Sequence, residues 1–150
     1  MNFNMNIPGL KDVEITKIEE LEMGMAISIE LPRQAHQCPA CQQWTTKVHD
    51  YRIQKIKHLK WFERMTVIFY KRRRYACGCG KRFAEKASFI ERYQRFTKEA
   101  NQALSIRAIK AKTFKEAAEV TGNSSTTVIR RFKKIDNKEM VKGVHLPKAI

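Results

Sequence analysis

Two short stretches, Cys38-Pro39-Ala40-Cys41 and Cys77-Gly78-Cys79-Gly80, bound the region of the sequence that decides the fold. They contain all four cysteines of the chain, and residues 42–76 separate them. Each stretch forms a tight turn that can present two sulfurs, and Zn²⁺ prefers four thiolates in a tetrahedron at about 2.3 Å. The glycines let the backbone of the second turn bend sharply. We predict one structural Zn²⁺, held by Cys38, Cys41, Cys77 and Cys79.

Four cysteines can also hold an iron–sulfur cluster or include a redox-active pair. An iron–sulfur cluster also takes four thiolates, but the C-x-C spacing and the basic surroundings differ from the usual runs. A redox C-x-x-C pair lacks the βαβ context expected of it. His36 and His49 lie nearby in the sequence, but four thiolates already complete a zinc site. We therefore assign each histidine to the surface or to a contact with the cysteine ligands, and not to the metal itself. Such a closed site has no open position for catalysis.

The charge of the chain is strongly positive, with a net charge of +15 and a pI near 9.9. Residues 1–37 carry three basic and six acidic side chains, whereas residues 50–82 carry eleven and two, and residues 83–150 carry fifteen and seven. A concentrated basic field predicts a nucleic-acid partner. A merely solvated basic surface and attraction to anionic lipid are the alternatives, but no basic helix with a large aromatic face supports a membrane partner.

The first six residues have neither the basic nor the apolar segment of a signal peptide. No apolar stretch is long enough to span a bilayer. We therefore expect a cytoplasmic protein, in a compartment where thiols stay reduced and a four-cysteine set binds metal instead of forming disulfides.

The first half of the chain has the patterns of β structure. Apolar residues alternate over 12–18 and over 25–31, and residues 22–24 between them suit a hairpin turn. We assign residues 1–37 to an N-terminal β unit. Residues 38–87 are predicted to form a zinc-ribbon domain, because the region between the cysteine pairs is rich in strand formers.

A run of four cations, Lys71-Arg72-Arg73-Arg74, lies in the ribbon region. Alternate residues of a strand point to one face, and a basic face can follow DNA phosphates, whose neutralisation dominates non-specific affinity. The alternative is a solvated edge that its charge protects from aggregation. We take Lys71, Arg72, Arg73 and Arg74 as candidate DNA contacts.

Residues 88–135 change to a helical period and are predicted to form a three-helix helix-turn-helix domain. Thr97 is a candidate N-cap for the first helix, and Thr113 with Glu116 fits a capping box at the second. Gly122 supplies the left-handed residue of the turn. The chain is therefore predicted to be α+β, with a small β zinc-ribbon domain before the helices and a linker over 136–150.

The third helix is the candidate recognition helix, since a helix-turn-helix places the N-terminal end of its second helix in the major groove. Ser124 can cap this helix, and Asn123 departs from the apolar residue more usual in such a turn. A plain helical hairpin with a basic surface is the alternative. The candidates for base edges are Ser125, Thr126 and Arg130, and those for phosphates are Thr127, Arg131, Lys133 and Lys134.

The order of these motifs resembles the N-terminal part of bacterial insertion-sequence transposases of the ISL-three (ISL3) family. The residues that carry the resemblance are Cys38-Pro39-Ala40-Cys41, Val48-His49-Asp50-Tyr51, Arg72-Arg73-Arg74-Tyr75-Ala76-Cys77 and Lys81-Arg82-Phe83, followed by the helix-turn-helix. The resemblance implies a zinc ribbon and a helix-turn-helix that bind the terminal inverted repeats of an element, with the four cysteines as zinc ligands. Double-stranded DNA is then the partner, the nucleoid the expected location, and a homodimer is compatible with the sequence.

In that family a catalytic domain with three acidic metal ligands follows this region. The acids after Cys79 are spread over predicted helical surfaces and do not pair for two-metal chemistry. We expect a truncated transposase, or the DNA-binding part of one, that binds DNA without cutting or joining it. A free-standing zinc-ribbon and helix-turn-helix repressor and an active nuclease are the competing hypotheses.

Overall fold

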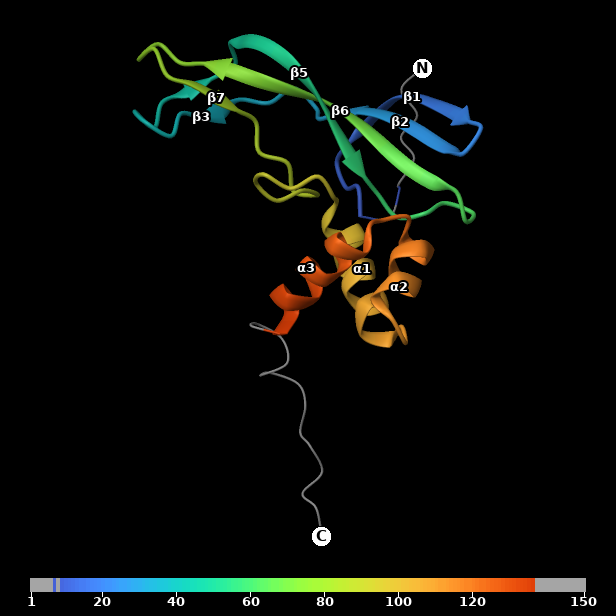
Figure 1. Ribbon diagram of the computed structural model, residues 1–150. Coiled ribbons are helices and arrows are strands. Elements are labelled where there is room, and N and C mark those ends of the chain that lie inside the picture. The colour runs from blue at the N-terminus through green and yellow to red at the C-terminus, as the bar shows by residue number, and fades with distance from the viewer. Residues whose placement is uncertain (1–6, 8, 137–150) are drawn as a thin grey trace. The chain divides into compact units, whose positions relative to one another are not determined.

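The computed structural model describes residue 7 and residues 9–136, and it confirms the α+β class, with strands before helices (Figure 1). The described residues divide into two compact units at the boundary between Ala100 and Asn101. The elements are β1 (Glu14–Leu21), β2 (Gly24–Glu30), β3 (His36–Gln37), β4 (Trp44–Thr45), β5 (Val48–Lys57), β6 (Met65–Ala76), β7 (Arg82–Ala84), α1 (Lys98–Lys110), α2 (Phe114–Thr121) and α3 (Ser125–Asp136).

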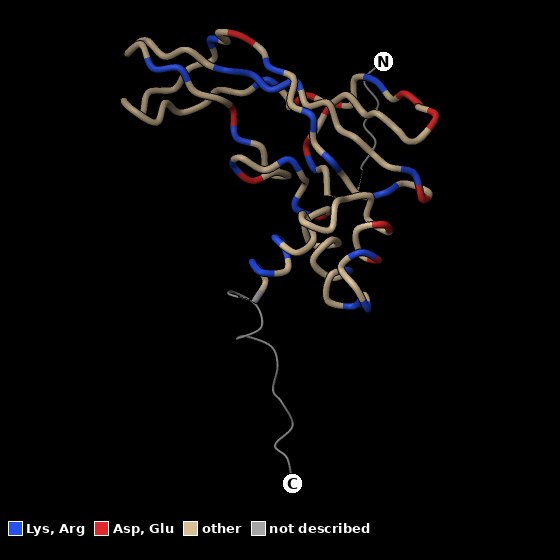
Figure 2. Tube along the Cα trace, viewed as in Figure 1, with Lys and Arg blue, Asp and Glu red and all other residues tan. Residues whose placement is uncertain are grey.

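One sheet of order β1-β2-β6-β5 forms the centre of the first unit. β1 and β2 form the expected antiparallel hairpin, and β2 then pairs in parallel with β6. β5 pairs antiparallel with β6 along its whole length, and β7 joins β6 beyond the end of β2. The boundary predicted between residues 37 and 38 therefore does not separate two packing units, because the N-terminal strands share a sheet with the cysteine-bounded region. Acidic residues lie near the β1–β2 turn and basic residues along β6 (Figure 2).

Strand β6 contributes to two cores on opposite faces of the sheet. In its first half Thr66, Ile68 and Tyr70 are buried, whereas in its second half the buried residues are Arg73 and Tyr75. Side chains two residues apart share a face, so the buried face changes between Tyr70 and Arg73. The first core also contains Ile15, Ile27, Ile29, Ile56 and Phe89.

The second, smaller core lies at the end of the sheet next to the cysteine turns. We call this part, which consists of β3, β4, β7 and the last residues of β6, the ribbon end. The ring of His36 on β3 lies 4.6 Å from that of Tyr75, and the ring of Phe83 on β7 lies 6.0 Å from it on centroids. Strands β3 and β4 form a separate two-stranded sheet, and the Thr45 hydroxyl donates to the Ala76 carbonyl at 2.9 Å. The small sheet of β3 and β4 is therefore attached to the last residues of β6.

Gly24 marks the point where β2 comes closest to β6. A Cβ atom at this position would lie 2.3 Å from the main-chain oxygen of Met65. Since the obstacle is backbone in a paired strand, relief requires β2 to shift against β6. We expect Gly24→Ala to lower the free energy of unfolding by roughly 1–3 kcal/mol, as overpacking does. Urea unfolding followed by tryptophan fluorescence measures this, because both tryptophans, Trp44 and Trp61, lie in this unit.

Gly78→Ala is the matched control, because a Cβ atom at Gly78 meets nothing within 4 Å. Equal losses of stability in the two variants would contradict a close approach at Gly24.

The helical unit has a core of its own, and its helix ends confirm most of the predicted caps. The Thr97 and Thr113 hydroxyls accept from the main-chain N–H groups of Ala100 and Glu116 at 3.2 and 3.1 Å. The Glu116 carboxylate binds the N–H of Lys112 instead of closing the reciprocal bond of a capping box. None of the helices in the described part of the chain is long and apolar enough to cross a membrane. The buried core residues are Leu104, Ala108, Ala117, Ala118 and Val128.

Candidate metal centre and nucleic-acid interface

The four cysteines converge at the ribbon end of the first unit, as predicted. Their sulfur atoms all lie within 4.8 Å of one another, with Cys38 and Cys79 at 3.7 Å and Cys41 and Cys77 at 3.3 Å. All four are free thiols. A tetrahedral Zn²⁺ site with bonds of about 2.3 Å has sulfur–sulfur edges of about 3.8 Å. The cluster therefore fits Zn²⁺, which would supply a structural cross-link there and leave no open coordination position.

The two cysteine turns have the same main-chain pattern. In the first, the Cys38 N–H donates to Gln43 and the Cys38 carbonyl accepts from Gln42, both at 2.9 Å. In the second, Cys77 makes the equivalent bonds with Lys81 and Gly80, both at 3.0 Å. The residue after the last cysteine of each turn is left-handed, with φ of 61° at Gln42 and 85° at Gly80. The second turn is one residue shorter, and Gly80 meets its backbone requirement without strain.

The thiols compete for protons because they lie so close together. The main-chain amide of Cys41 lowers the pKa of Cys38 to about 7. The Gln43 amide also lowers the pKa of Cys41. The neighbouring Cys77 thiol and burial outweigh it, however, and raise the pKa of Cys41 to about 12. Four thiolates at these distances repel one another, and a divalent cation removes that repulsion as it displaces the protons.

Neither nearby histidine belongs to the sulfur cluster. Burial lowers the pKa of His36, which favours the neutral ring, and that ring packs against Tyr75 as part of the ribbon core. His49 is exposed on β5.

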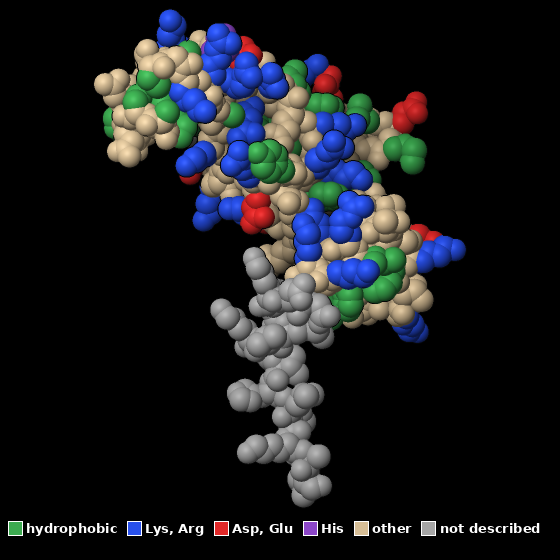
Figure 3. All heavy atoms as spheres, turned by 60° about the vertical axis from the view of Figure 1, so that its left-hand side comes forward, with side chains coloured by type: hydrophobic (Ala, Val, Ile, Leu, Met, Phe, Trp, Pro, Cys, Tyr) green, Lys and Arg blue, Asp and Glu red, His purple; other side chains and the backbone are tan. Residues whose placement is uncertain are grey.

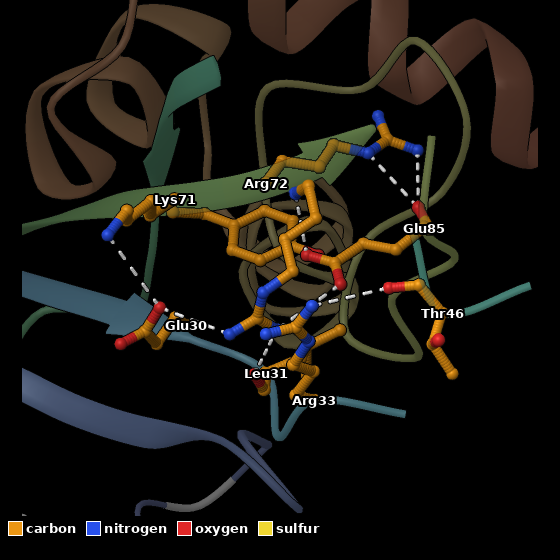
Figure 4. A network of polar contacts seen from close by, with 9 residues as sticks. Glu30, Leu31, Arg33, Thr46, Lys71, Arg72 and Glu85 are labelled. Carbon is orange, nitrogen blue, oxygen red and sulfur yellow. Dashed lines mark hydrogen bonds and ion pairs between the residues drawn. The ribbon is translucent and has the colours of Figure 1, made fainter. Parts of the chain in front are cut away.

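The cationic run does not form one exposed stripe. Arg73 is buried, and its guanidinium lies 3.2 Å from the Glu30 carboxylate and 3.6 Å from that of Glu85. The same guanidinium donates to the Leu31 carbonyl. Arg73 therefore joins β2, β6 and the segment after β7, through Glu30, Leu31 and Glu85, and we do not retain it as a phosphate contact. Figure 4 shows these three partners within the polar network.

The other three cations of the run remain accessible. The Lys71 side chain is half exposed, with its ammonium 4.7 Å from the centre of the Tyr51 ring. Arg72 and Arg74 are partly exposed and lie on the opposite face of the sheet from Lys71. Arg52 lies directly opposite Arg72 in the sheet register and is exposed. It was not among the predicted contacts, because the sequence does not show which β5 residue faces which residue of β6.

Helices α2 and α3 and the turn between them have helix-turn-helix geometry. Gly122 is left-handed with φ of 64°, its N–H donates to the Glu119 carbonyl, and the Asn123 N–H donates to Ala118 at 2.9 Å. These two bonds form a Schellman motif. The Asn123 side chain also donates to the Thr121 carbonyl at 3.0 Å, which explains a polar residue in the turn.

Helix α3 has one exposed face and one packed face. The Ser124 hydroxyl caps it by accepting from the Thr127 N–H at 3.3 Å, and it also bonds the Thr127 hydroxyl. Val128 is buried in the helical core, and the ring of Phe132 meets that of Phe114 at 5.2 Å. Of the predicted contacts, Ser125, Thr127 and Arg131 are half-buried, while the exposed ones are Thr126, Arg130, Lys133 and Lys134.

On the side shown in Figure 3, each of the two units carries more lysine and arginine side chains than acidic ones.

Comparison with known families gives two matches, which follow one another along the chain. Residues 34–80 match the zinc-finger of transposase IS204/IS1001/IS1096/IS1165, and residues 85–136 match the helix-turn-helix domain of transposase family ISL3. Neither match is to a catalytic domain.

Comparisons with curated proteins and with solved structures found no match. The two family matches agree with the geometry, because the first covers all four cysteines and the second covers the capped turn and α3. Both domains indicate DNA binding in a transposase. Over residues 34–136 the chain therefore belongs to the ISL3 family of transposases, with that family's zinc ribbon followed by its helix-turn-helix.

Proposed function

We propose that this chain recognises the terminal inverted repeats of its insertion element, with α3 reading the sequence and the zinc ribbon adding backbone contacts. The observation that carries the proposal is the exposed face of α3. Thr126, Arg130 and Lys134 follow one another at four-residue spacing, and Lys133 lies beside them. A capped helix with hydroxyl and arginine side chains on its outer face is suited to the major groove.

The roles along α3 follow from position on the helix. Ser125, Thr126 and Arg130 lie in its first two turns, which an inserted recognition helix directs at base edges. Thr127, Arg131, Lys133 and Lys134 lie farther along or to the sides and contact phosphates. Both matched families are transposase domains, so a free-standing repressor is not favoured. In this proposal strand cleavage belongs to an acidic, metal-binding catalytic domain of the full-length relatives.

Zinc would act in this function only as a structural ion. Its four cysteine ligands would hold the two turns together and fix the end of β6 beside β5 and β7. A homodimer would hold both ends of an element at once.

Arg130→Ala tests the reading of bases. Loss of a bidentate contact to a base is expected to cost about 1–3 kcal/mol of discrimination between the inverted repeat and random DNA. The measurement compares dissociation constants on the two duplexes by fluorescence anisotropy over a range of salt concentrations. Affinity for random DNA should fall much less than affinity for the repeat.

Lys133→Ala is the control on the same helix face. A phosphate contact should weaken binding to both duplexes equally and reduce the salt dependence by about one unit of slope. An Arg130 variant that behaves like the Lys133 variant would assign Arg130 to phosphate. An unaltered protein that does not prefer the repeat over random DNA would refute the proposed function.

A further inference from the structure

Three arginines lie together on one face of the β5–β6 pair. Arg52 is directly opposite Arg72 in the strand register, and Arg74 follows Arg72 by two residues on the same face. The adjacent strand β7 places the small residue Ala84 opposite Arg74. Arg52 is exposed, and Arg72 and Arg74 are partly exposed. We call Arg52, Arg72 and Arg74 the arginine cluster.

Two members of the cluster, Arg72 and Arg74, are held in place because each donates two hydrogen bonds from one edge of its guanidinium group. The Nε and Nη2 atoms of Arg72 donate to the main-chain oxygen of Glu85 at 3.1 and 2.9 Å. The corresponding atoms of Arg74 donate to the Asp50 carboxylate at 2.7 and 2.8 Å. In both residues this leaves the Nη1 group available to another acceptor, and in Figure 4 one nitrogen of Arg72 points away from Glu85. Such fixed guanidinium groups lose little entropy when they bind an oxyanion.

The cluster carries an unbalanced charge. Arg52 and Arg72 are like charges directly across a strand pair, which is a destabilising arrangement. Asp50 is the acid that faces this group, and both of its oxygens already bind Arg74. Two positive charges therefore remain after that pair is counted, and an anion between the strands would relieve their repulsion.

We propose that the arginine cluster binds phosphodiester groups of the DNA backbone, at a site separate from the base-reading face of α3. This inference rests on the proposed DNA binding and adds a particular contact surface to it. Residues two apart on a strand are about 6.6–6.8 Å apart. The free edges of Arg72 and Arg74, with Arg52 opposite, therefore suit a row of phosphates better than a single small anion.

The test compares two exposed residues on the same strand. Arg52→Gln and Lys55→Gln each remove one positive charge from β5, but their side chains point to opposite faces of the sheet. The whole chain, loaded with zinc, is titrated with a random-sequence duplex of about 20 base pairs at several salt concentrations. Loss of one phosphate contact should reduce the salt slope by about 0.9 and the affinity roughly eightfold at 0.1 M salt. We expect that loss in Arg52→Gln and a clearly smaller one in Lys55→Gln.

Equal effects of the two substitutions, or no effect of Arg52→Gln, would overturn the assignment of this face. Tighter, Arg52-dependent binding to single-stranded RNA of the same length would overturn the choice of DNA. Failure of the unaltered protein to bind any duplex would instead refute the proposed function itself. Arg52→Lys provides a second check: retention of charge with a measurable loss of affinity supports contact through the guanidinium.

Discussion

The Cys77→Ser variant is expected to lose its zinc and to unfold the ribbon end of the β unit. A serine hydroxyl stays protonated at neutral pH and does not replace a thiolate in a Zn²⁺ site. The ribbon end has little else to stabilise it, since its core consists mainly of Tyr75 with His36 and Phe83 around it. Binding of structural zinc contributes on the order of 10 kcal/mol to the folding of such small sites. Native mass spectrometry measures the zinc content directly.

Fluorescence and helicity should separate local from global unfolding in this variant. Trp44 lies on β4 next to the cysteine turns, so its emission should shift when the ribbon end opens. The helical core around Leu104 and Val128 is a separate cluster, so helical circular dichroism should persist. His49→Ala is the control, because this exposed histidine lies near the cysteines in sequence but outside the sulfur cluster. Unchanged zinc in Cys77→Ser, or loss of zinc in His49→Ala, would contradict the ligand assignment.

The features that could be predicted from the sequence depend on residues close together in the chain. Each cysteine turn is set within a few residues, and so are the caps at Thr97, Thr113 and Ser124. The Gly122 turn depends on one left-handed residue and its two main-chain bonds. For the same reason the antiparallel β1–β2 hairpin could be recognised from its alternation and short turn.

The features that could not be predicted depend on strands far apart in the chain. The parallel pairing of β2 with β6 leaves no signature in either strand, so the N-terminal strands looked like a unit of their own. The change of buried face along β6 likewise has no local cause, because the first core covers one half of the strand and the ribbon end covers the other. That change turns Arg73 inward, whereas the alternation of a strand is enough to place Lys71 on the opposite face from Arg72 and Arg74.

The buried positive charge of Arg73 needs negative partners, and Glu85 is the more deeply buried of the two carboxylates beside it. Glu85 is fully buried, and one of its carboxylate oxygens accepts from the Tyr70 hydroxyl at 2.7 Å and from the Arg73 N–H at 3.0 Å. Burial and the Glu85 carboxylate raise the pKa of Tyr70, which keeps its hydroxyl protonated as the donor. The other Glu85 oxygen faces the Arg73 guanidinium at 3.6 Å. The Glu85 carboxylate therefore contacts side chains from both faces of β6, Tyr70 and Arg73, at the point where the buried face changes.

Glu85→Gln is accordingly expected to lower the free energy of unfolding of the β unit by about 3–5 kcal/mol, because it leaves a buried guanidinium short of a counter-charge. The amide keeps the shape of the side chain but replaces one acceptor with a donor that faces other donors. Urea unfolding of the zinc-loaded protein, followed by tryptophan fluorescence, measures the loss.

Glu30→Gln makes the same chemical change on the other side of Arg73. Glu30 lies 3.2 Å from the guanidinium, but its side chain is 22% exposed, so water compensates for part of the lost charge. Its substitution should therefore cost clearly less than that of Glu85, because Arg73 keeps its buried partner. If the two variants lose equal stability, exposure does not decide the strength of these pairs. If neither loses any, the inward orientation of Arg73 does not depend on the carboxylates, and Arg73 would again be a candidate for the DNA surface.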